Sequence, residues 1–288
     1  RQGPLGRKLA AFVAQRWARR NEKLAFAAVA EQRCFPIGSL QLNEQSRPLQ
    51  FSPPEDIFMV TLFHHPFCPH SRFVRMALSE LGDAPRLVEE HVWERRESFL
   101  ALNPAGTTPV LAEEAGPAVP GAAIIAEYLD ETRGASLGEH RLLPQNPHER
   151  VEVRRLMSWF HDKFFEEVTN LLVTEKVYKH HMTVEQGGGS PDTSAIRVAR
   201  HNIRYHLAYI GWLVRTRNWL AGDRLTYADL AAAAHLSCAD YTGDVPWNED
   251  EAAKNWYARV KSRPSFRPIL ADLIPGLPPA PSYADLDF

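Results

Sequence analysis

Leu225-Thr226-Tyr227-Ala228-Asp229-Leu230 is the most specific local signal in this sequence. Asp229 follows Thr226 by three residues, which is the spacing of a helix capping box, with Asp in the usual Glu or Gln position. Leu225 and Leu230 are placed to form the hydrophobic staple that accompanies such a box. Four alanines follow, so we expect a helix that starts here and packs tightly in a core. We interpret Thr226 and Asp229 as structural residues.

The sequence around this motif is predicted to be all-helical. From Pro147 onward strand patterns vanish, and apolar residues recur at helical spacing over 153–171 and again over 196–214. These stripes mark two long amphipathic helices, separated by a flexible break at Gly187-Gly188-Gly189-Ser190-Pro191. We therefore expect an all-helical domain over residues 147–272.

Residues 59–133 alternate between strand and helix patterns. Val60-Thr61-Leu62-Phe63 is a β-prone run, and from Ser71 to Leu81 apolar residues recur at helical spacing until Gly82. The further expected elements are a strand at 87–92, a short helix at 98–102, a strand pair after 103 and a helix through 123–129. This order within about 75 residues indicates an α/β domain. The predicted fold class is thus an α/β domain followed by an all-α domain.

The first 58 residues differ in composition from the rest of the chain. Residues 1–35 hold eight Lys or Arg and two Asp or Glu, and 36–56 are polar and interrupted by prolines, as in a linker. One interpretation is an Arg-rich targeting peptide or membrane-surface helix. The other is a stretch upstream of the true start at Met59. We leave 1–58 out of the fold prediction and expect weak order there.

Composition excludes several classes of protein. The chain has 288 residues and a net charge of −2, so no overall basic field exists to hold nucleic acid. Three cysteines are too few for a disulfide framework, which favours a reducing compartment, and we expect the cytoplasm. No apolar run approaches the roughly 18 residues of a membrane span.

Cys68 is the most chemically suggestive residue. It is expected where a strand gives way to a helix, with Pro69 in the first turn, and a helix N-terminus favours a thiolate. Cys68-Pro69-His70-Ser71 is a redox Cys-x-x-Cys frame with Ser71 in the second position, so turnover would need an external thiol such as glutathione. The alternative is a small buried cysteine at the sheet edge. We predict no metal site, since the spacing of Cys68 and its neighbouring histidines matches no zinc motif.

Three motifs resemble the cytosolic glutathione S-transferase superfamily: Cys68-Pro69-His70-Ser71 with Val74-Arg75, the run Asn103-Pro104-Ala105-Gly106-Thr107-Thr108-Pro109-Val110-Leu111, and Thr226-Tyr227-Ala228-Asp229. The resemblance covers about residues 59–270. It implies a thioredoxin-like domain at 59–133 and a helical bundle at 147–272. It also implies that Pro109 is a cis-proline, that the Val110 backbone meets the cysteinyl part of glutathione, and that Cys68 and Ser71 are the candidate catalytic residues.

The sequence departs from that family at the start of the third expected helix. Active relatives have Glu-Ser or Gln-Ser there, which hold the γ-glutamyl carboxylate of glutathione, whereas this chain has Gly121-Ala122. Neither side chain can form a hydrogen bond. Losing contacts to a carboxylate costs roughly 1.5–3 kcal/mol each, or about tenfold in affinity. The resemblance therefore implies glutathione as the ligand, weakly bound, and little or no transferase activity.

A narrower resemblance is to the FzlA type of glutathione-transferase-like division proteins of α-proteobacteria, which are dimers that bind the tubulin-like FtsZ. It covers the chain after Met59 and implies an FtsZ-binding scaffold that forms homodimers. The stretches that carry it are Leu62-Phe63-His64-His65-Pro66, Trp93-Glu94-Arg95-Arg96, His201-Asn202-Ile203-Arg204, Gly243-Asp244-Val245-Pro246-Trp247, Lys261-Ser262-Arg263-Pro264-Ser265-Phe266-Arg267-Pro268 and Tyr283-Ala284-Asp285-Leu286-Asp287-Phe288. The alternative function is a glutathione-dependent transferase or thiol transferase that uses Cys68.

The last segment, 273–288, is rich in proline and acidic residues. Its prolines are expected to hold it extended away from the helices. Such a tail can dock on a partner or fold back on its own body. The candidate partner-binding residues in it are Tyr283, Asp285, Asp287 and Phe288. Arg95, Arg96, Arg154 and Arg155 are candidate basic contacts, each with a solvated surface position as the alternative.

Overall fold

The computed structural model describes residues 60–285. The described residues belong to a single compact unit. The predictions for residues 1–58, Asp287 and Phe288 lie outside the described residues.

A small mixed sheet forms the first half of this unit. The strand order is β2-β1-β3-β4, with β1 parallel to β2, and with β3 antiparallel to both β1 and β4. The central strand β1 places Leu62 opposite Leu87 on one side and Leu111 on the other. The strands are β1 (Thr61–His64), β2 (Arg86–Glu89), β3 (Val110–Ala112) and β4 (Val119–Pro120).

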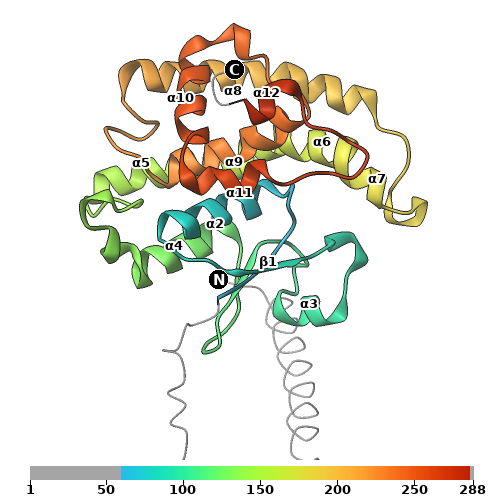
Figure 1. Cartoon of the computed structure of the whole chain (residues 1–288), viewed down its shortest axis with the longest axis horizontal. Coiled ribbons are helices and arrows are strands. Elements are labelled where there is room, and N and C mark those ends of the chain that lie inside the picture. The colour runs from blue at the N-terminus through green and yellow to red at the C-terminus, as the bar shows by residue number, and fades with distance from the viewer. Residues whose placement is uncertain (1–59, 286–288) are drawn as a thin grey trace, which may run out of the picture. The chain divides into compact units, whose positions relative to one another are not determined.

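Two helices separate the sheet from the helical half. The helices α2 (Pro69–Glu80) and α4 (Ala122–Thr132) contact each other, and α2 also packs against α9 of the helical half, as Figure 1 shows. The buried face of α2 includes Phe73, Val74 and Leu78, whose side chains are fully removed from water. The remaining elements of this half are η1 (Val92–Glu94), α3 (Glu97–Leu102) and η2 (Gly134–His140).

The second half of the unit is helical throughout the described residues. Its elements are α5 (Pro147–Ser158), η3 (Trp159–Thr169), α6 (Asn170–Val173), η4 (Thr174–Tyr178), α7 (Lys179–His181), η5 (Val184–Gln186), α8 (Thr193–Thr216), α9 (Tyr227–Tyr241), η6 (Trp247–Glu249), α10 (Glu251–Lys261), η7 (Pro264–Phe266), α11 (Arg267–Leu270) and α12 (Pro281–Ala284). The first expected long helix runs without a break from α5 to α7, but η3 and η4 are π-helical. Side-chain periodicity alone did not indicate this change of hydrogen-bond register.

The helix α9 lies in the centre of this half, and all of its side chains are buried. Its first turn is held by Asp229, whose carboxylate accepts hydrogen bonds from the backbone N–H and hydroxyl of Thr226 at 3.0 and 3.1 Å. The other carboxylate oxygen accepts from Leu220 N and Trp256 Nε1, each at 3.0 Å. Asp229 therefore joins the start of α9 to α10 and to the loop that precedes α9.

The C-terminal segment corrects one prediction. The expectation that the prolines hold it away from the helices is wrong, because Tyr283 is completely buried. Its ring lies 5.0 Å from that of Tyr241, and its hydroxyl donates to the carbonyl oxygen of Ile269 at 2.9 Å. Tyr283 is therefore a core residue and is not available on the surface for a partner.

Lys261 binds the same segment through its side-chain ammonium group. Its Nζ donates to the carbonyl oxygens of Ser282 and Asp285, each at 2.7 Å. Proline restricts the backbone but does not prevent packing, and Pro281 is the first residue of the short helix α12. The segment thus folds back on its own body over the residues that the structure describes.

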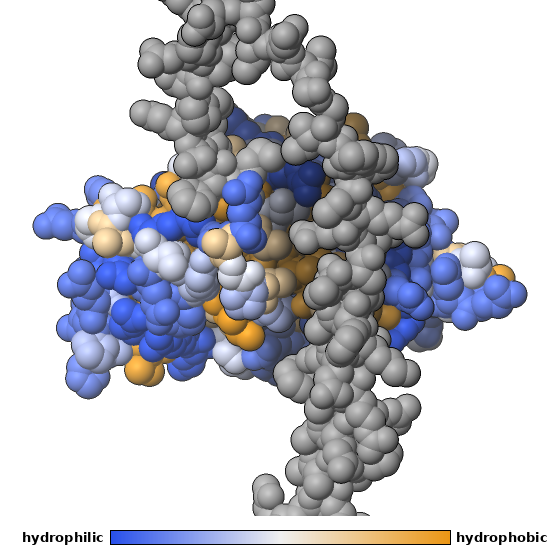
Figure 2. Space-filling view, turned by 90° about the horizontal axis from the view of Figure 1, so that it is seen from below, coloured by the Kyte–Doolittle hydropathy of each residue, from blue (hydrophilic) through white to orange (hydrophobic). Residues whose placement is uncertain are grey.

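Among residues 60–285 we find no helix both long and apolar enough to cross a membrane. Figure 2 shows the molecule from below: hydrophilic residues cover the two sides of that face, and hydrophobic residues gather toward its middle. Exposed apolar side chains that stand alone are normal on protein surfaces. Two such side chains are Ile124 on α4 and Val151 on α5.

Candidate functional site

Cys68 lies between β1 and α2, as the N-cap residue of α2 with extended backbone and with Pro69 following. A turn closes just before the helix, since Cys68 N donates to the carbonyl oxygen of His65 at 3.0 Å. The buried Arg72 fixes this turn, because its Nε donates to the Pro66 carbonyl at 2.7 Å and its Nη1 donates to Ser237 Oγ at 2.8 Å. Both halves of the unit therefore hold the turn that carries the thiol.

The Cys68 thiol is nearly buried and surrounded by polar groups. Its Sγ lies 3.6 Å from the carbonyl oxygen of Thr108, to which it donates. Burial raises the pKa of the thiol, but the hydrogen bond and charge of His70, with smaller contributions from Ser71 and Thr108, outweigh burial and lower the pKa from 9 to about 7. A substantial fraction of Cys68 is therefore thiolate at neutral pH.

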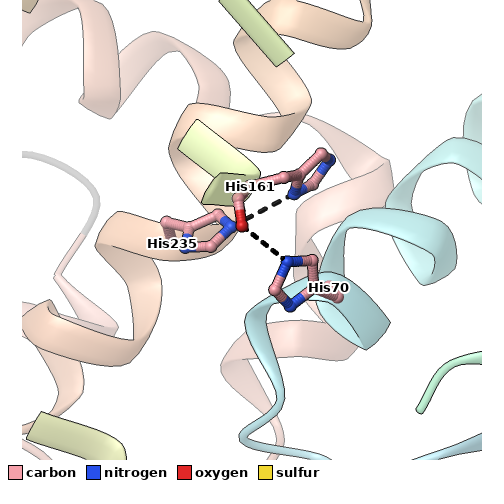
Figure 3. Close-up of side chains that lie close together, drawn as sticks. All are labelled: His70, His161 and His235. Atoms are coloured by element: carbon pink, nitrogen blue, oxygen red, sulfur yellow. Dashed lines mark hydrogen bonds between the residues drawn. The ribbon is translucent and has the colours of Figure 1, made fainter. Parts of the chain in front are cut away.

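His70 connects this thiol to the helical half. Its Nε2–H donates to the backbone carbonyl oxygen of His161 at 3.0 Å, as Figure 3 shows, which leaves Nδ1 as the nitrogen that can face the thiol. His161 belongs to the π-helical stretch η3. Burial lowers the pKa of His70, but its interaction with Cys68 more than offsets this, so the pKa is raised.

Two further histidines lie behind His70 (Figure 3). His161 Nδ1 and His235 Nε2 share a hydrogen bond of 3.2 Å, and His235 Nδ1 is 3.1 Å from Thr169 Oγ1. Burial lowers the pKa of both rings far below the usual value, so both are neutral at pH 7. The two neutral rings therefore form a hydrogen-bonded contact between η3 and α9.

The three rings place nitrogen atoms within 4.8 Å of one another, a spacing that a metal ion can bridge. The donor chemistry does not fit, because His70 Nε2 is bonded to a carbonyl and the other two facing nitrogens are bonded to each other. A metal ligand needs a free lone pair on neutral imidazole.

His65, Glu89 and His91 form a second such group. His65 Nδ1 accepts from Phe67 N at 3.1 Å, so its other nitrogen carries the proton and has no lone pair to offer. We assign no metal to either group. The sequence analysis missed both groups, since their members come together only in the fold.

A cavity of about 410 Å³ opens in front of Cys68 and His70. The peptide bond between Thr108 and Pro109 is cis. The residues that line the cavity are Cys68, Pro69, His70, Val92, Gly106, Thr107, Thr108, Gly121, Ala122, Phe165, Asn170, Val173 and Tyr178. None of these described lining residues is Arg, Lys, Asp or Glu. The cavity is therefore mainly apolar, with a thiol and an imidazole among its lining groups.

Gly121 and Ala122, at the start of α4, also line this cavity. Gly121 has a positive φ of 89° and its N–H already donates to the Pro109 carbonyl at 3.0 Å, so this amide is not free. A helix leaves the N–H groups of its first turn without internal acceptors. The backbone N–H groups in the first turn of α4 are therefore the groups that can bind a carboxylate in this part of the cavity.

Two family models match the chain. Residues 62–137 match the glutathione S-transferase N-terminal domain, and residues 192–264 match the glutathione S-transferase C-terminal domain. The chain belongs to the glutathione S-transferase family. The predicted family and fold class are therefore confirmed. The cavity at Cys68 is lined by residues of the matched N-terminal domain and by four residues between 165 and 178, which lie between the two matched ranges.

The similar proteins carry two kinds of name. FtsZ-localized protein A of Caulobacter vibrioides is 47% identical over 231 residues, which are 79% of this chain and 98% of that protein. The structure of FzlA from C. crescentus has 46% identity and a TM-score of 0.73, covering 80% of this chain and all of the other. A glutathione S-transferase structure from Sinorhizobium meliloti has 53% identity and a TM-score of 0.78 at the same coverage.

The structure brings some predicted site residues of this glutathione S-transferase family member together and not others. Cys68, Gly121 and Ala122 line the cavity. Ser71 does not line it, but its buried hydroxyl interacts with the Cys68 thiol. Val110 is buried at the start of β3 and does not line the cavity. The tail residues Tyr283 and Asp285 pack on α9 and α10, and no residue of the tail lines this cavity among the described positions.

The side chains that sequence reasoning missed come from the helical half. Phe165, Asn170, Val173 and Tyr178 lie in or beside the π-helical stretches and close the cavity from above. Their spacing in the sequence resembles an ordinary amphipathic helix, so no local signal separates cavity residues from core residues.

Of the four candidate basic contacts, three are in ion pairs. Arg154 Nε donates to Glu127 at 2.7 Å, Arg155 Nε donates to Glu152 at 2.8 Å, and Arg96 pairs with the buried Glu90. Arg95 is exposed and has a positive φ of 50°. Arg154 and Arg155 are neighbours on α5, whereas Arg95 and Arg96 lie between η1 and α3 in the first half of the unit.

Proposed function

We propose that this chain is a cytoplasmic cell-division scaffold that binds FtsZ polymer and has little or no transferase activity. The observation that carries the proposal is the 47% identity to FtsZ-localized protein A over 98% of that protein. A match that spans nearly the whole of that protein concerns more than a single shared domain.

The chemistry of the cavity supports weak use of glutathione. Glutathione carries two carboxylates, and the described lining contains no arginine or lysine to pair with them. Gly121 and Ala122 contribute no side-chain hydrogen bond, and the Gly121 amide is occupied. Each missing contact to a charged group weakens binding by roughly 1.5–3 kcal/mol. We therefore expect poor retention on immobilised glutathione.

Co-sedimentation with assembled FtsZ tests the scaffold function. The full chain should pellet with the polymer and stay in the supernatant without it, and the Cys68→Ser variant should pellet equally because the thiol is not needed. A chain that ends at Asp285 removes Asp287 and Phe288 while keeping the buried Tyr283. Loss of pelleting in that variant, with an unchanged melting temperature, would support a role for the last residues in partner binding.

We also propose that the scaffold is a homodimer that forms through α4 and α5. Ile124 on α4 and Val151 on α5 are 60% and 63% exposed. The Glu127–Arg154 ion pair, with a Nε–Oε1 distance of 2.7 Å, joins the same two helices. Exposed apolar residues beside a preorganised ion pair fit a self-complementary two-fold contact.

A second candidate is a glutathione-dependent thiol transferase. It is favoured by one observation, the thiol pKa of about 7 beside His70 in an open cavity. The Cys68 thiolate would attack one sulfur of a substrate disulfide, forming a mixed disulfide and releasing the other half as a thiol. Glutathione would then restore Cys68. Retention on a glutathione column together with a rate abolished by Cys68→Ser would favour this function over the scaffold alone.

A further inference from the structure

A second cavity of about 460 Å³ lies between α8 and the loop that follows α9. It shares no lining residue with the cavity at Cys68 among the described positions. Two of the sequence stretches singled out above, at 201–204 and 243–247, contribute to it. The lining residues are Arg197, Arg200, His201 and Arg204 from α8 and Gly243, Asp244, Val245 and Pro246 from the loop. We call it the α8 groove.

The arginines of the α8 groove are held in place through their inner nitrogens. Arg200 Nε donates to Asp244 at 2.7 Å, and the buried Asp244 also pairs with Lys176 at 2.6 Å. Arg204 Nε donates to Glu249 at 2.7 Å, and its Nη1 donates to the Arg200 carbonyl at 3.0 Å. Within residues 60–285 these contacts leave both terminal nitrogens of Arg200 and the Nη2 of Arg204 without acceptors.

Arg197 is exposed and has neither an ion pair nor a hydrogen bond within the described part of the chain. The lining of the α8 groove therefore holds three guanidinium groups and one carboxylate, that of Asp244, which also pairs with Lys176; Glu249, which does not line the groove, pairs with Arg204. The chain as a whole has a net charge of −2, so this positive charge is a local concentration. Such a surface attracts anionic groups.

The spacing of the arginines favours an extended peptide. Along a helix, Arg197 and Arg200 differ in height by about 4.5 Å, and Arg200 and Arg204 by about 6 Å. Side chains on one side of an extended strand repeat every 6.6–6.8 Å or so, close to the second interval. Carboxylates at alternate positions of such a peptide can each meet one guanidinium fork.

The neighbouring surface adds apolar contacts. Val198 and Tyr205, each one position beyond a groove arginine, are 52% and 59% exposed. Tyrosine and arginine are enriched at protein interfaces, where the ring supplies area and the guanidinium supplies directed hydrogen bonds. A metabolite phosphate would use the arginines but not these two side chains.

We propose that the α8 groove binds an extended acidic segment of a partner protein, in which carboxylates alternate with apolar residues. The carboxylates pair with Arg197, Arg200 and Arg204, and the apolar residues contact Val198 and Tyr205. This binding site goes beyond the proposed function, which assigns α4 and α5 to a second copy of the chain but assigns no groove to another partner protein, and it does not depend on whether the partner is FtsZ.

The test uses a fluorescein-labelled peptide of four Glu-Leu repeats with blocked ends, titrated with the full chain and followed by fluorescence anisotropy. A Lys-Leu peptide of equal length should not bind. Arg197→Glu should weaken binding about tenfold, since it replaces one attraction by a repulsion without breaking a contact in the fold. Raising NaCl from about 50 to about 500 mM should weaken binding by a similar factor.

Arg267→Glu is the matched control, because Arg267 is also exposed and has no ion pair within the described chain but lies on α11. It should leave the affinity unchanged. Equal weakening by both variants would overturn the proposal, since net charge alone would then explain binding. Displacement of the peptide by inorganic phosphate at equal concentration would overturn it too, and so would an Arg197→Glu variant that binds as well as the wild type.

Discussion

The His70 imidazole lies between a thiol and a backbone carbonyl that come from different halves of the fold. Its Nε2–H is bonded to the His161 carbonyl, and its other nitrogen is left for Cys68. A π-helical stretch offers carbonyls in a register that an α-helix does not, and such stretches are frequent at functional sites. The protonation state of the Cys68 thiol therefore depends on how the two halves of the fold pack together.

At this scale we predict that His70→Gln raises the pKa of the Cys68 thiol. Burial, which raises the pKa, would remain, while the largest contribution that lowers it from 9 to about 7 would be lost. At pH 7 the thiolate fraction would fall from about one half to about 1%, so alkylation of Cys68 should slow about 50-fold. The measurement is the iodoacetamide rate against pH, followed on the Cys68 peptide by mass spectrometry.

His180→Gln serves as the control for this experiment, since His180 is exposed at the end of the first long helical run. It should leave the pH profile of Cys68 unchanged. A midpoint near 7 in both variants would mean that His70 does not activate the thiol.

At the scale of elements, the C-terminal segment shows what sequence patterns contain and what they lack. The prolines correctly mark a segment without long helices, but its path is decided by Tyr283, Tyr241 and Ile269, which are far apart in the sequence. The start of α9, by contrast, could be predicted because the groups of its capping box lie within four residues. Local signals predicted elements, while contacts between elements needed the fold.

Some residues of the candidate site could likewise be predicted from the sequence, and others could not. Cys68 could be placed at a helix start from the strand and proline around it, and the Gly121-Ala122 departure could be found by counting from the helix that follows. The side chains from η3 to η4 that close the cavity could not be found, nor could the His161 carbonyl that orients His70. Their positions follow from the packing of two halves.

For the tail, we predict that Tyr283→Ala destabilises the protein by about 3–5 kcal/mol, as truncation of a large buried aromatic side chain does. Tyr283→Phe should cost only about 1 kcal/mol, because it removes the hydrogen bond to Ile269 and keeps the packing. Urea denaturation followed by circular dichroism measures both. If Tyr283→Ala lost less than about 0.5 kcal/mol, the tail would not be part of the core.

At the scale of the whole molecule, buried histidines couple stability to pH. Burial lowers the pKa of His64 from 6.5 to about 4 and that of His65 to about 3. The unfolded chain binds these protons first, so the stability present above pH 6.5 is lost as the pH falls toward 4. Of the histidines with a resolved shift, those lowered are His64, His65, His161, His206 and His235, and those raised are His70 and His91.

Because more histidines are lowered than raised, we predict that the free energy of unfolding falls by several kcal/mol between pH 7 and pH 5. Replacing His65 by Asn should make the loss smaller by up to about 1.4 kcal/mol per pH unit below 6.5. Urea titrations at successive pH values give both slopes. A flat profile down to pH 5 would contradict burial of neutral histidines.

The proposed dimer contact contains two exposed apolar side chains, Ile124 and Val151. We predict that the double variant Ile124→Asp/Val151→Asp is monomeric, because two charges would be buried without partners in the dimer interface that α4 and α5 of each copy form. Size-exclusion chromatography with light scattering measures the mass. Val184→Asp is the matched control, since Val184 is 85% exposed on η5, and this variant should remain dimeric. A double variant that keeps the dimer mass would place the contact elsewhere.

The proposed scaffold function requires recognition of a polymer by the folded chain and does not require the thiol. The most direct test is co-sedimentation of the full chain with assembled FtsZ, beside the Cys68→Ser variant and a sample without polymer. The scaffold account predicts that both proteins pellet only with polymer, in equal and saturable amounts. A wild-type chain that stays in the supernatant at every FtsZ concentration, while it turns over glutathione through Cys68, would contradict it.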